Sequence, residues 1–210
     1  MKTITLQIDG EEVGAKPGMT VLEAAREAGI DIPTLCDHDE IKPYGVCRIC
    51  SVEVERKGKS RVVVSCGFPV EQGLVVKTRS PRIDRIRKVI LELVAPTTTL
   101  DGQAAGDIKR IAGEYGADVH RFESRFRTKP TRCILCGRCV RYCDEVMGES
   151  AIGFVGRGVD RRVVFFPEKA RVCITCQGCF NLCPTGKIAS ETDFVVFDGF
   201  SVEDCLPGER

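Results

Sequence analysis

The chain has 210 residues, of which 43% are hydrophobic and 6% aromatic, and its formal net charge is +1. This size allows two or three small modules with apolar cores of limited size. The start "MKTITLQIDG" has no positively charged segment followed by a long apolar run, and no apolar run in the chain reaches transmembrane length. Neither a disulfide framework nor a membrane span is therefore expected. We expect a cytoplasmic protein whose 13 cysteines bind metal or carry out redox chemistry.

Residues 1–78 are predicted to form a mixed β-sheet that grasps one helix. The alternating segment "TITLQI" predicts a half-buried strand, and "DGEE" predicts a tight hairpin to a short return strand. In the helix "TVLEAAREAG", Thr20 and Glu23 have the spacing of a capping box. Its apolar face is expected to consist of Val21, Leu22, Ala25 and Ala28. The other strand candidates are "SVEVE", "RVVVSC" and "LVVKT".

Residues 79–129 are predicted to form a helical connector. The segment "PRIDRIRKVILELV" has apolar residues at helical spacing with basic residues opposite, and Pro96 follows its end. A second short helix is expected in "IKRIAGEYGA". The apolar stripe of the first helix is expected to be Ile83, Ile86, Val89, Ile90 and Leu93.

Residues 130–190 contain an internal repeat, since "CILCGRCVRYC" recurs as "CITCQGCFNLCP". Between the copies, "AIGFVGRGVDRRVVFFPE" predicts a hairpin. Residues 191–210 form an acidic tail that contains Cys205, which we expect to be a free thiol. Residues 191–209 hold six acidic residues and no basic one, whereas residues 121–141 hold seven basic residues and one acidic. The two segments are either solvated faces or complementary docking surfaces.

The repeated spacing Cys-x-x-Cys-x-x-Cys-x-x-x-Cys is typical of [4Fe–4S] clusters. Zinc is the alternative, but its sites usually use two Cys-x-x-Cys pairs. In two-cluster ferredoxins, the first three cysteines of a run bind one cluster and the fourth binds the other. The first cluster is therefore expected to bind Cys133, Cys136, Cys139 and Cys183. The second is expected to bind Cys143, Cys173, Cys176 and Cys179. The α+β chain would then end in a bacterial-type ferredoxin domain with two [4Fe–4S] clusters.

A separate cysteine set lies in the β-rich part, and its members are Cys36, Cys47, Cys50 and Cys66. Four thiolates with one close pair in a β-rich host favour a [2Fe–2S] cluster over zinc. Neither His38 nor His120 is expected to be a ligand, because four thiolates are already available and His120 has no cysteine near it. Apolar neighbours are expected to keep water from the clusters, namely Val46, Ile49, Ile134, Leu135 and Ile174.

No catalytic residues are expected on this chain. All-thiolate clusters leave no open coordination position, and no nucleophile triad, P-loop or dinucleotide fingerprint accompanies them. The basic stretches lack interleaved aromatic residues, so nucleic acid is not an expected partner. The sequence therefore indicates transfer of single electrons.

Several of these motifs carry a resemblance to a known family. "GMTVLEAAREAGIDIPTLC", "GVCRICSVEV", "RCILCGRCVRYCDEV" and "CITCQGCFNLCPTGKI" resemble the N-terminal part of the large iron–sulfur subunit of respiratory complex I. They also resemble the diaphorase small subunit of NAD-reducing hydrogenases and iron–sulfur segments of NAD-dependent formate dehydrogenases. The resemblance implies a hetero-oligomer in which FMN and NAD(H) bind a partner subunit and another subunit, such as a hydrogenase or formate dehydrogenase, carries the catalytic site.

One departure from this family is visible in the sequence. Its members usually insert a segment with one histidine and three cysteines that binds an additional [4Fe–4S] cluster. Here "APTTTLDGQAAGDIKR" occupies the place and contains neither residue. We therefore expect three clusters, one [2Fe–2S] and two [4Fe–4S].

Three alternative functions remain open from the sequence. The chain could be a free ferredoxin-like carrier, although the helical connector adds a surface that a carrier does not need. It could be an iron–sulfur subunit of the succinate dehydrogenase or fumarate reductase type, although both cysteine runs here are regular. The third alternative is a zinc-stabilised interaction module without redox activity.

Overall fold

The computed structural model describes residues 3–98, 105–122 and 132–188. The chain divides into two compact units. The N-terminal unit consists of Met1–Asp37, Pro43–Leu93 and Arg110–Phe122. The C-terminal unit consists of His38–Lys42, Val94–Lys109 and Glu123–Arg210. The domain boundaries expected at residues 78, 129 and 190 stay predictions, and Cys205 and the acidic tail lie outside the described residues.

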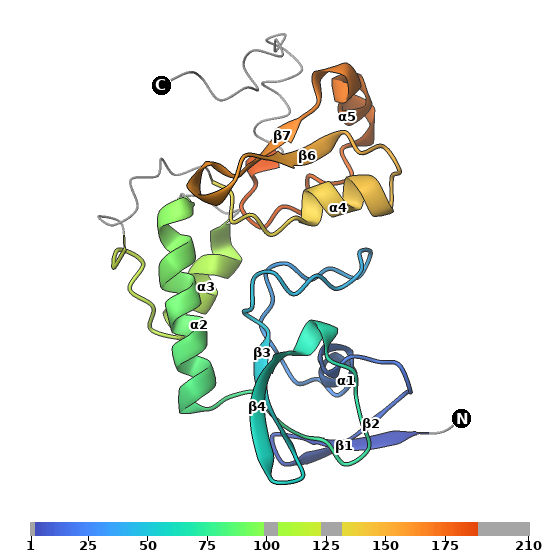
Figure 1. The fold of residues 1–210 in the computed structure, drawn as a ribbon, viewed down its shortest axis with the longest axis vertical. Helices are drawn as coiled ribbons and strands as arrows, with labels where there is room; N and C mark the ends of the chain where they lie inside the picture. The colour runs from blue at the N-terminus through green and yellow to red at the C-terminus, as the bar shows by residue number, and fades with distance from the viewer. Residues whose placement is uncertain (1–2, 99–104, 123–131, 189–210) are drawn as a thin grey trace. The chain divides into compact units, whose positions relative to one another are not determined.

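A five-stranded mixed sheet forms the framework of the N-terminal unit, in the order β2-β1-β5-β3-β4 (Figure 1). The strands are β1 Ile4–Ile8, β2 Glu11–Ala15, β3 Ser51–Arg56, β4 Lys59–Val64 and β5 Val75–Lys77. Strands β1 and β5 are parallel, and the other neighbours are antiparallel. The predicted "DG" hairpin is confirmed, because Asp9 and Gly10 turn with φ of 52° and 89° and join β1 to β2.

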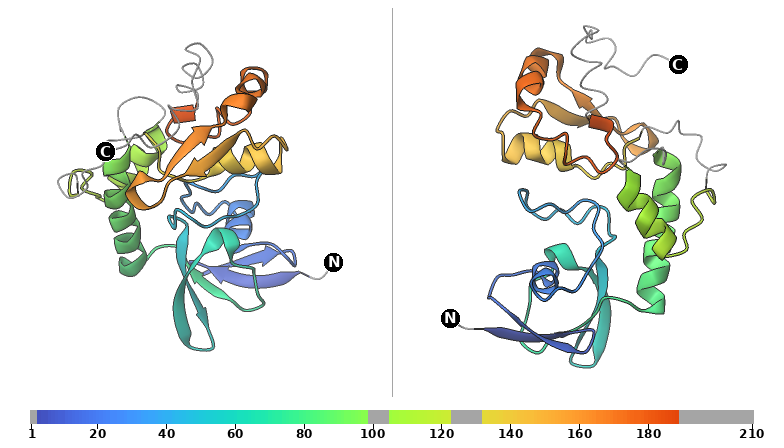
Figure 2. Two further views of the ribbon diagram at one scale, coloured as in Figure 1. Left: turned by 45° about the horizontal axis from the view of Figure 1, so that its top comes forward. Right: turned by 180° about the vertical axis from the view of Figure 1, so that it is seen from behind.

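Helix α1, Val21–Glu27, packs on this sheet (Figure 2). The predicted capping box is confirmed: the Glu23 N–H donates to Thr20 Oγ1 at 3.2 Å, and the Thr20 N–H donates to Glu23 Oε2 at 2.6 Å. Its buried face differs by one residue from the prediction, because Ala24 is buried and Ala28 is exposed. The apolar side of α1 and the inner face of the sheet form one core.

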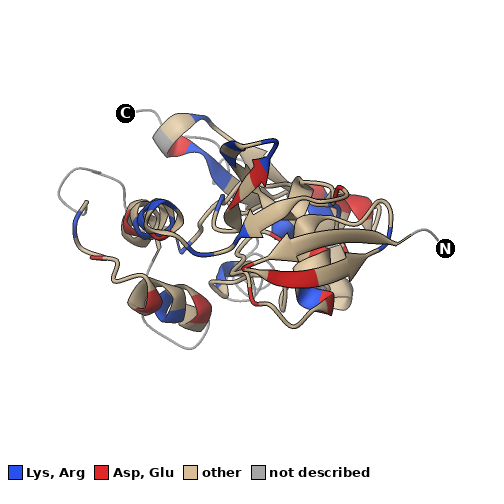
Figure 3. Ribbon diagram, turned by 90° about the horizontal axis from the view of Figure 1, so that it is seen from below, with Lys and Arg blue, Asp and Glu red and all other residues tan. Residues whose placement is uncertain are grey.

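Helices α2, Pro81–Val94, and α3, Gly106–Glu114, lie where helical periodicity predicted them. Both carry interspersed charges of the two signs (Figure 3). The predicted apolar stripe of α2 is wrong in part, because Leu93 is 42% exposed, whereas Arg87 and Glu92 are buried with Ile83 and Leu91. Both buried charged side chains form hydrogen bonds. Glu92 accepts from the Asp118 N–H and from Arg121, and Arg87 donates to three oxygens.

The C-terminal unit combines a hairpin with short helices. The predicted hairpin is confirmed, with β6 and β7 antiparallel. Its elements in chain order are α4 Arg138–Glu145, β6 Ile152–Val155, β7 Arg162–Phe165 and α5 Ala170–Cys176. Cysteines and apolar residues share its core, which includes Cys139, Cys143, Ile152, Phe165, Cys173, Cys179, Leu182 and Ile188. In the described part of the chain, no helix is long and apolar enough to cross a membrane.

Candidate metal centres

The four cysteines of the N-terminal unit come together at one place. Cys36 and Cys47 belong to the long loop after α1, Cys50 immediately precedes β3, and Cys66 lies in the short 3-10 turn after β4. Three of them are buried, and Cys47 is half-buried. Electrostatic effects of Cys36 reach both Cys50 and Cys66, so the four sulfurs form one cluster of thiols.

The four thiols of this site form two hydrogen-bonded pairs. The Cys47 thiol donates to Cys36 and lowers the pKa of Cys36 to about 6, and Cys66 in the same way lowers the pKa of Cys50 to about 7. The pKa values of the donors Cys47 and Cys66 are raised by the same hydrogen bonds and by burial. In each pair one thiol therefore ionises more readily than its partner, and binding of a cation has to displace the protons that remain.

The loop around Cys47 aims backbone N–H groups at sulfur. The Cys47 N–H donates to Cys36 Sγ at 3.5 Å, and a tight turn follows in which Arg48 has φ of 63° and its carbonyl accepts from Ser51 Oγ at 2.6 Å. Of the apolar neighbours expected to exclude water, Ile49 is fully buried, but Val46 is 43% exposed. This side of the site therefore reaches the surface of the unit at Val46.

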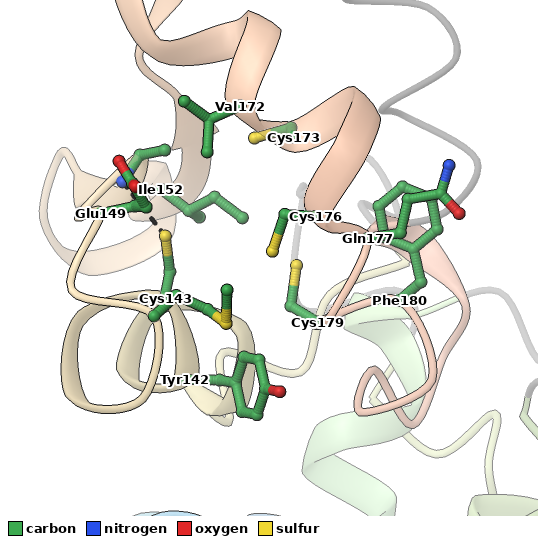
Figure 4. A pocket seen from close by; sticks show the side chains of 12 residues that line it. Tyr142, Cys143, Glu149, Ile152, Val172, Cys173, Cys176, Gln177, Cys179 and Phe180 are labelled. Atoms are coloured by element: carbon green, nitrogen blue, oxygen red, sulfur yellow. Dashed lines mark hydrogen bonds between the residues drawn. The ribbon is translucent and has the colours of Figure 1, made fainter.

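In the C-terminal unit, one pocket gathers cysteines from both copies of the repeat. Figure 4 shows Cys143, Cys173, Cys176 and Cys179 around it, together with apolar side chains such as Ile152 and Phe180. Cys143 comes from α4 and the other three from α5 and the loop that follows. The structure thus brings the fourth cysteine of the first run to the first three of the second run.

The remaining four cysteines of the described residues, Cys133, Cys136, Cys139 and Cys183, also interact electrostatically. Burial raises the pKa of Cys136 to about 11, with Cys183 and Cys133 adding to the increase. Burial also raises the pKa of Cys139, and Cys136, Cys183, Cys179 and Cys133 contribute in the same direction. Cys183, the last cysteine of the second run, is therefore within electrostatic reach of Cys136 and Cys139 of the first run.

Local backbone geometry repeats with the sequence. The residue after the second cysteine of each run is left-handed, with φ of 77° at Gly137 and 47° at Gln177. Backbone N–H groups donate to sulfur here as well, from Ala151 to Cys143 Sγ at 3.1 Å and from Leu135 to Cys133 Sγ at 3.4 Å. Such hydrogen bonds stabilise the thiolate form of cysteine, and they shift the reduction potential of iron–sulfur clusters that thiolates bind.

The cysteine thiols are the candidate metal donors of both units. Among the residues that the structure describes, no three His, Cys, Asp or Glu side chains converge closely enough to hold a single metal ion. The four cysteines of the C-terminal pocket line it together with apolar side chains. Soft thiolates around an apolar pocket are the donors that iron–sulfur clusters use, so the residues present fit such a group.

The two histidines take part in local hydrogen bonds of their own loops. His38 Nδ1 accepts from the Glu40 N–H at 3.3 Å, and the His120 N–H donates to Asp118 Oδ1 at 3.1 Å. Sequence reasoning missed Arg87, which binds the backbone on both sides of Cys50. The position of Arg87 in the helical pattern does not indicate burial, because its hydrogen-bond acceptors come from segments distant in the sequence.

Two protein families match separate parts of the chain. Residues 1–81 match the family described as "2Fe-2S iron-sulfur cluster binding domain". Residues 124–189 match the family described as "NADH-quinone oxidoreductase subunit 3, ferredoxin-like domain". The two matches coincide with the two cysteine-rich segments.

Similar proteins contain both segments. The chain is 35% identical over 205 residues to the NADPH-Fe(3+) oxidoreductase subunit alpha of Geobacter sulfurreducens, covering 90% of this chain and 24% of that protein. It is 32% identical over 207 residues to the mitochondrial NADH-ubiquinone oxidoreductase 78 kDa subunit of Neurospora crassa, covering 90% of this chain and 28% of that protein. The chain thus spans about a quarter of the length of these relatives.

A solved structure has a similar fold. It is the crystal structure of an NAD+-reducing [NiFe]-hydrogenase in the H2-reduced state, and one of its chains matches with 33% identity and a TM-score of 0.67. The match covers 77% of this chain and 74% of that chain. The chain belongs to the iron–sulfur protein family that includes the N-terminal regions of the 75 and 78 kDa subunits of complex I and the matching chain of this hydrogenase.

Proposed function

We propose that this chain carries single electrons through one [2Fe–2S] and two [4Fe–4S] clusters, as the relay subunit of an NAD(P)H-linked flavin oxidoreductase complex. The observation that carries the proposal is the pocket shared by Cys143, Cys173, Cys176 and Cys179. This pocket combines the fourth cysteine of one run with three cysteines of the other, as the crossed ligand sets of two-cluster ferredoxins do. A zinc module in which each run binds its own ion does not require such a combination.

Each proposed cluster has four thiolate ligands. The [2Fe–2S] cluster binds Cys36, Cys47, Cys50 and Cys66. The first [4Fe–4S] cluster binds Cys133, Cys136, Cys139 and Cys183, and the second binds Cys143, Cys173, Cys176 and Cys179. When bound, these clusters supply reversible one-electron oxidation and reduction.

The chain's own residues control the surroundings of these thiolates. Burial of most of the cysteines limits contact with water, which favours electron transfer over side reactions. The N–H groups of Cys47, Leu135 and Ala151 donate to sulfur and stabilise its negative charge. Binding of iron must displace protons from buried thiols such as Cys136 and Cys179, the latter with a pKa raised by burial to about 12.

The proposed partners are a flavin subunit that binds FMN and oxidises or reduces NAD(P)(H), and a separate catalytic subunit. The similarity to oxidoreductases named for NADPH, NADH or NAD+ supports the link to a nicotinamide cofactor. The relay then works inside a cytoplasmic hetero-oligomer. Co-purification of these partners would favour the subunit over a free carrier.

Metal analysis tests the cluster content. Two, four and four irons predict about ten irons with matching labile sulfide in anaerobically purified protein, and reduction should give EPR signals of two cluster types. About fourteen irons would show that a further [4Fe–4S] cluster exists. Colourless protein containing zinc and no labile sulfide would overturn the proposal.

A Cys143→Ser variant tests the crossed ligand sets. We expect it to disturb the cluster of Cys173, Cys176 and Cys179, and to leave that of Cys133, Cys136 and Cys139 with its four ligands. Cys205→Ser is the matched control, because the proposal gives Cys205 no ligand role. Loss of only the first [4Fe–4S] cluster in Cys143→Ser would contradict the crossed sets.

A further inference from the structure

Arg87 is a fully buried guanidinium in the N-terminal unit. Its exposed fraction is 0%, although it lies on the same helix as the exposed Arg82 and Arg85. Arginine is almost never fully buried unless its charge is paired, because the charged form loses its hydration. A buried arginine therefore points to a nearby group of opposite charge.

The hydrogen bonds of Arg87 fix it beside the backbone that flanks Cys50. Nε donates to the Ile49 carbonyl at 3.0 Å, and Nη2 donates to the Ser51 carbonyl at 2.9 Å, so the guanidinium binds the residues on both sides of Cys50. Nη1 donates to Tyr115 Oη at 2.7 Å. All three acceptors are neutral oxygens, which satisfy N–H groups but do not balance the positive charge.

The proposed [2Fe–2S] cluster is a candidate for the balancing charge. Four thiolates around an oxidised core carry a net charge of about −2, and one added electron makes it about −3. A cation held nearby in a poorly hydrated interior attracts the reduced form more strongly than the oxidised form. The neutral acceptors named above cannot have this effect.

We propose that Arg87 is the counter-charge of the [2Fe–2S] cluster and a positioning residue for the Ile49–Ser51 turn, and that it raises the reduction potential of this cluster. The inference rests on the proposed function, in which Cys50 is a ligand. The reaction concerned is the gain of one electron by the cluster, without a change at Arg87 itself. Arg87 thereby sets how readily this cluster accepts electrons from a reduced partner.

Redox titration of the full chain, followed by the EPR signal of the [2Fe–2S] cluster, tests the inference. The variants Arg87→Met and Arg87→Gln remove the charge, Arg87→Lys keeps it with fewer hydrogen bonds, and Arg85→Met removes an exposed charge from the same helix. We expect the first two to lower the equilibrium constant for reduction at least tenfold, which is about 59 mV for one electron. Arg87→Lys should change it less than tenfold, and Arg85→Met should resemble the unmodified chain.

The outcomes separate this inference from the proposed function. If the unmodified chain contains no [2Fe–2S] signal, the proposed function fails and the role of Arg87 fails with it. If the signal is present and Arg87→Met and Arg87→Gln have unchanged potentials, only the role of Arg87 is overturned. Loss of the cluster in the uncharged variants with retention in Arg87→Lys supports a counter-charge, whereas loss in all three assigns Arg87 a structural role alone and overturns the proposal.

Discussion

Tyr115 is a mostly buried phenol that accepts a hydrogen bond from Arg87. Burial raises its pKa above the ordinary value of 10.0, while Arg87 and Arg79 oppose the increase and Glu114 adds to it. Because the folded pKa is the higher one, its contribution to stability is complete below about pH 10 and is lost as the pH rises through the folded pKa. The phenol therefore favours the fold only while it is protonated.

We predict that Tyr115→Phe makes the chain less sensitive to alkali. Between about pH 9 and about pH 11, the free energy of unfolding should fall by less in Tyr115→Phe than in the unmodified chain, because the variant has no phenol to ionise. Denaturant unfolding at the two pH values measures this difference. Tyr44→Phe, at an exposed tyrosine, is the control. An equal fall in Tyr115→Phe and the unmodified chain would contradict the prediction.

Gly178 lies against the Tyr142 ring in the loop between Cys176 and Cys179. A Cβ at Gly178 would come within 2.6 Å of a Tyr142 ring carbon, so alanine cannot fit without a shift of the ring or loop. We predict that Gly178→Ala destabilises the C-terminal unit by about 1–3 kcal/mol, the usual cost of overpacking. It should also weaken the EPR signal of the second [4Fe–4S] cluster, because the loop carries its proposed ligands.

Matched variants isolate this steric effect. Gly113→Ala on α3 meets no atom within 4 Å and should stabilise its helix by about 0.5–1 kcal/mol. Tyr142→Leu combined with Gly178→Ala should recover part of the lost stability, because it removes the clashing ring carbon. Additive losses in the double variant would show that the ring contact is not the cause.

At the scale of elements, the capping box of α1 gives a prediction on stability. Thr20→Ala removes the acceptor of the Glu23 N–H, and loss of an N-cap costs about 1 kcal/mol. Thr20→Ser keeps the acceptor and should cost less. Denaturant unfolding of the N-terminal unit compares the two variants, and equal losses would assign the effect to the methyl group of threonine instead.

Elements with local signals could be predicted from the sequence, whereas contacts between distant segments could not. The hairpin turn at Asp9 and Gly10 and the capping box of Thr20 depend on neighbouring residues, and the structure confirms both. The buried face of α2 depends on Ile49, Ser51 and Tyr115, which provide oxygens for Arg87. Helical periodicity takes no account of these distant acceptors, and it therefore predicted all the arginines of α2 on its polar face.

The candidate sites show the same division. The spacing within each run predicts cluster ligands, and the structure brings Cys143 into one pocket with Cys173, Cys176 and Cys179, while the ligand sets themselves stay predictions. The exposure of Val46 and the position of Arg87 depend on how loops fold, so no short motif encodes them.

At the scale of the whole molecule, the two units depend on their cysteines to different degrees. In the described part of the C-terminal unit, four of the ten buried residues of the core are cysteines. In the N-terminal unit the corresponding core has sixteen buried residues, of which two are cysteines, and a five-stranded sheet supports it. Cysteines therefore make up a larger share of this core in the C-terminal unit than in the N-terminal unit.

We predict that removal of the clusters unfolds the C-terminal unit first. Without metal, its cysteines leave a core of few apolar side chains, and the free energy of cluster binding is then lost from folding. The sheet of the N-terminal unit retains its strand pairs and the packing of α1. Hydrogen exchange of the full chain before and after treatment with a chelator and an oxidant should show loss of protection in α4, β6 and β7, with most protection kept in β1 and β3.

Cys143→Ser provides a graded version of this experiment. By weakening one proposed [4Fe–4S] site, it should lower protection in α4 and α5 while leaving β1 and β3 unchanged, because the N-terminal sheet contains none of the affected ligands. Equal loss of protection in both units would mean that they unfold as one cooperative body. Full protection of α4, β6 and β7 after complete loss of iron would mean instead that apolar packing alone holds the C-terminal unit together, and that its cysteines have no structural need of metal.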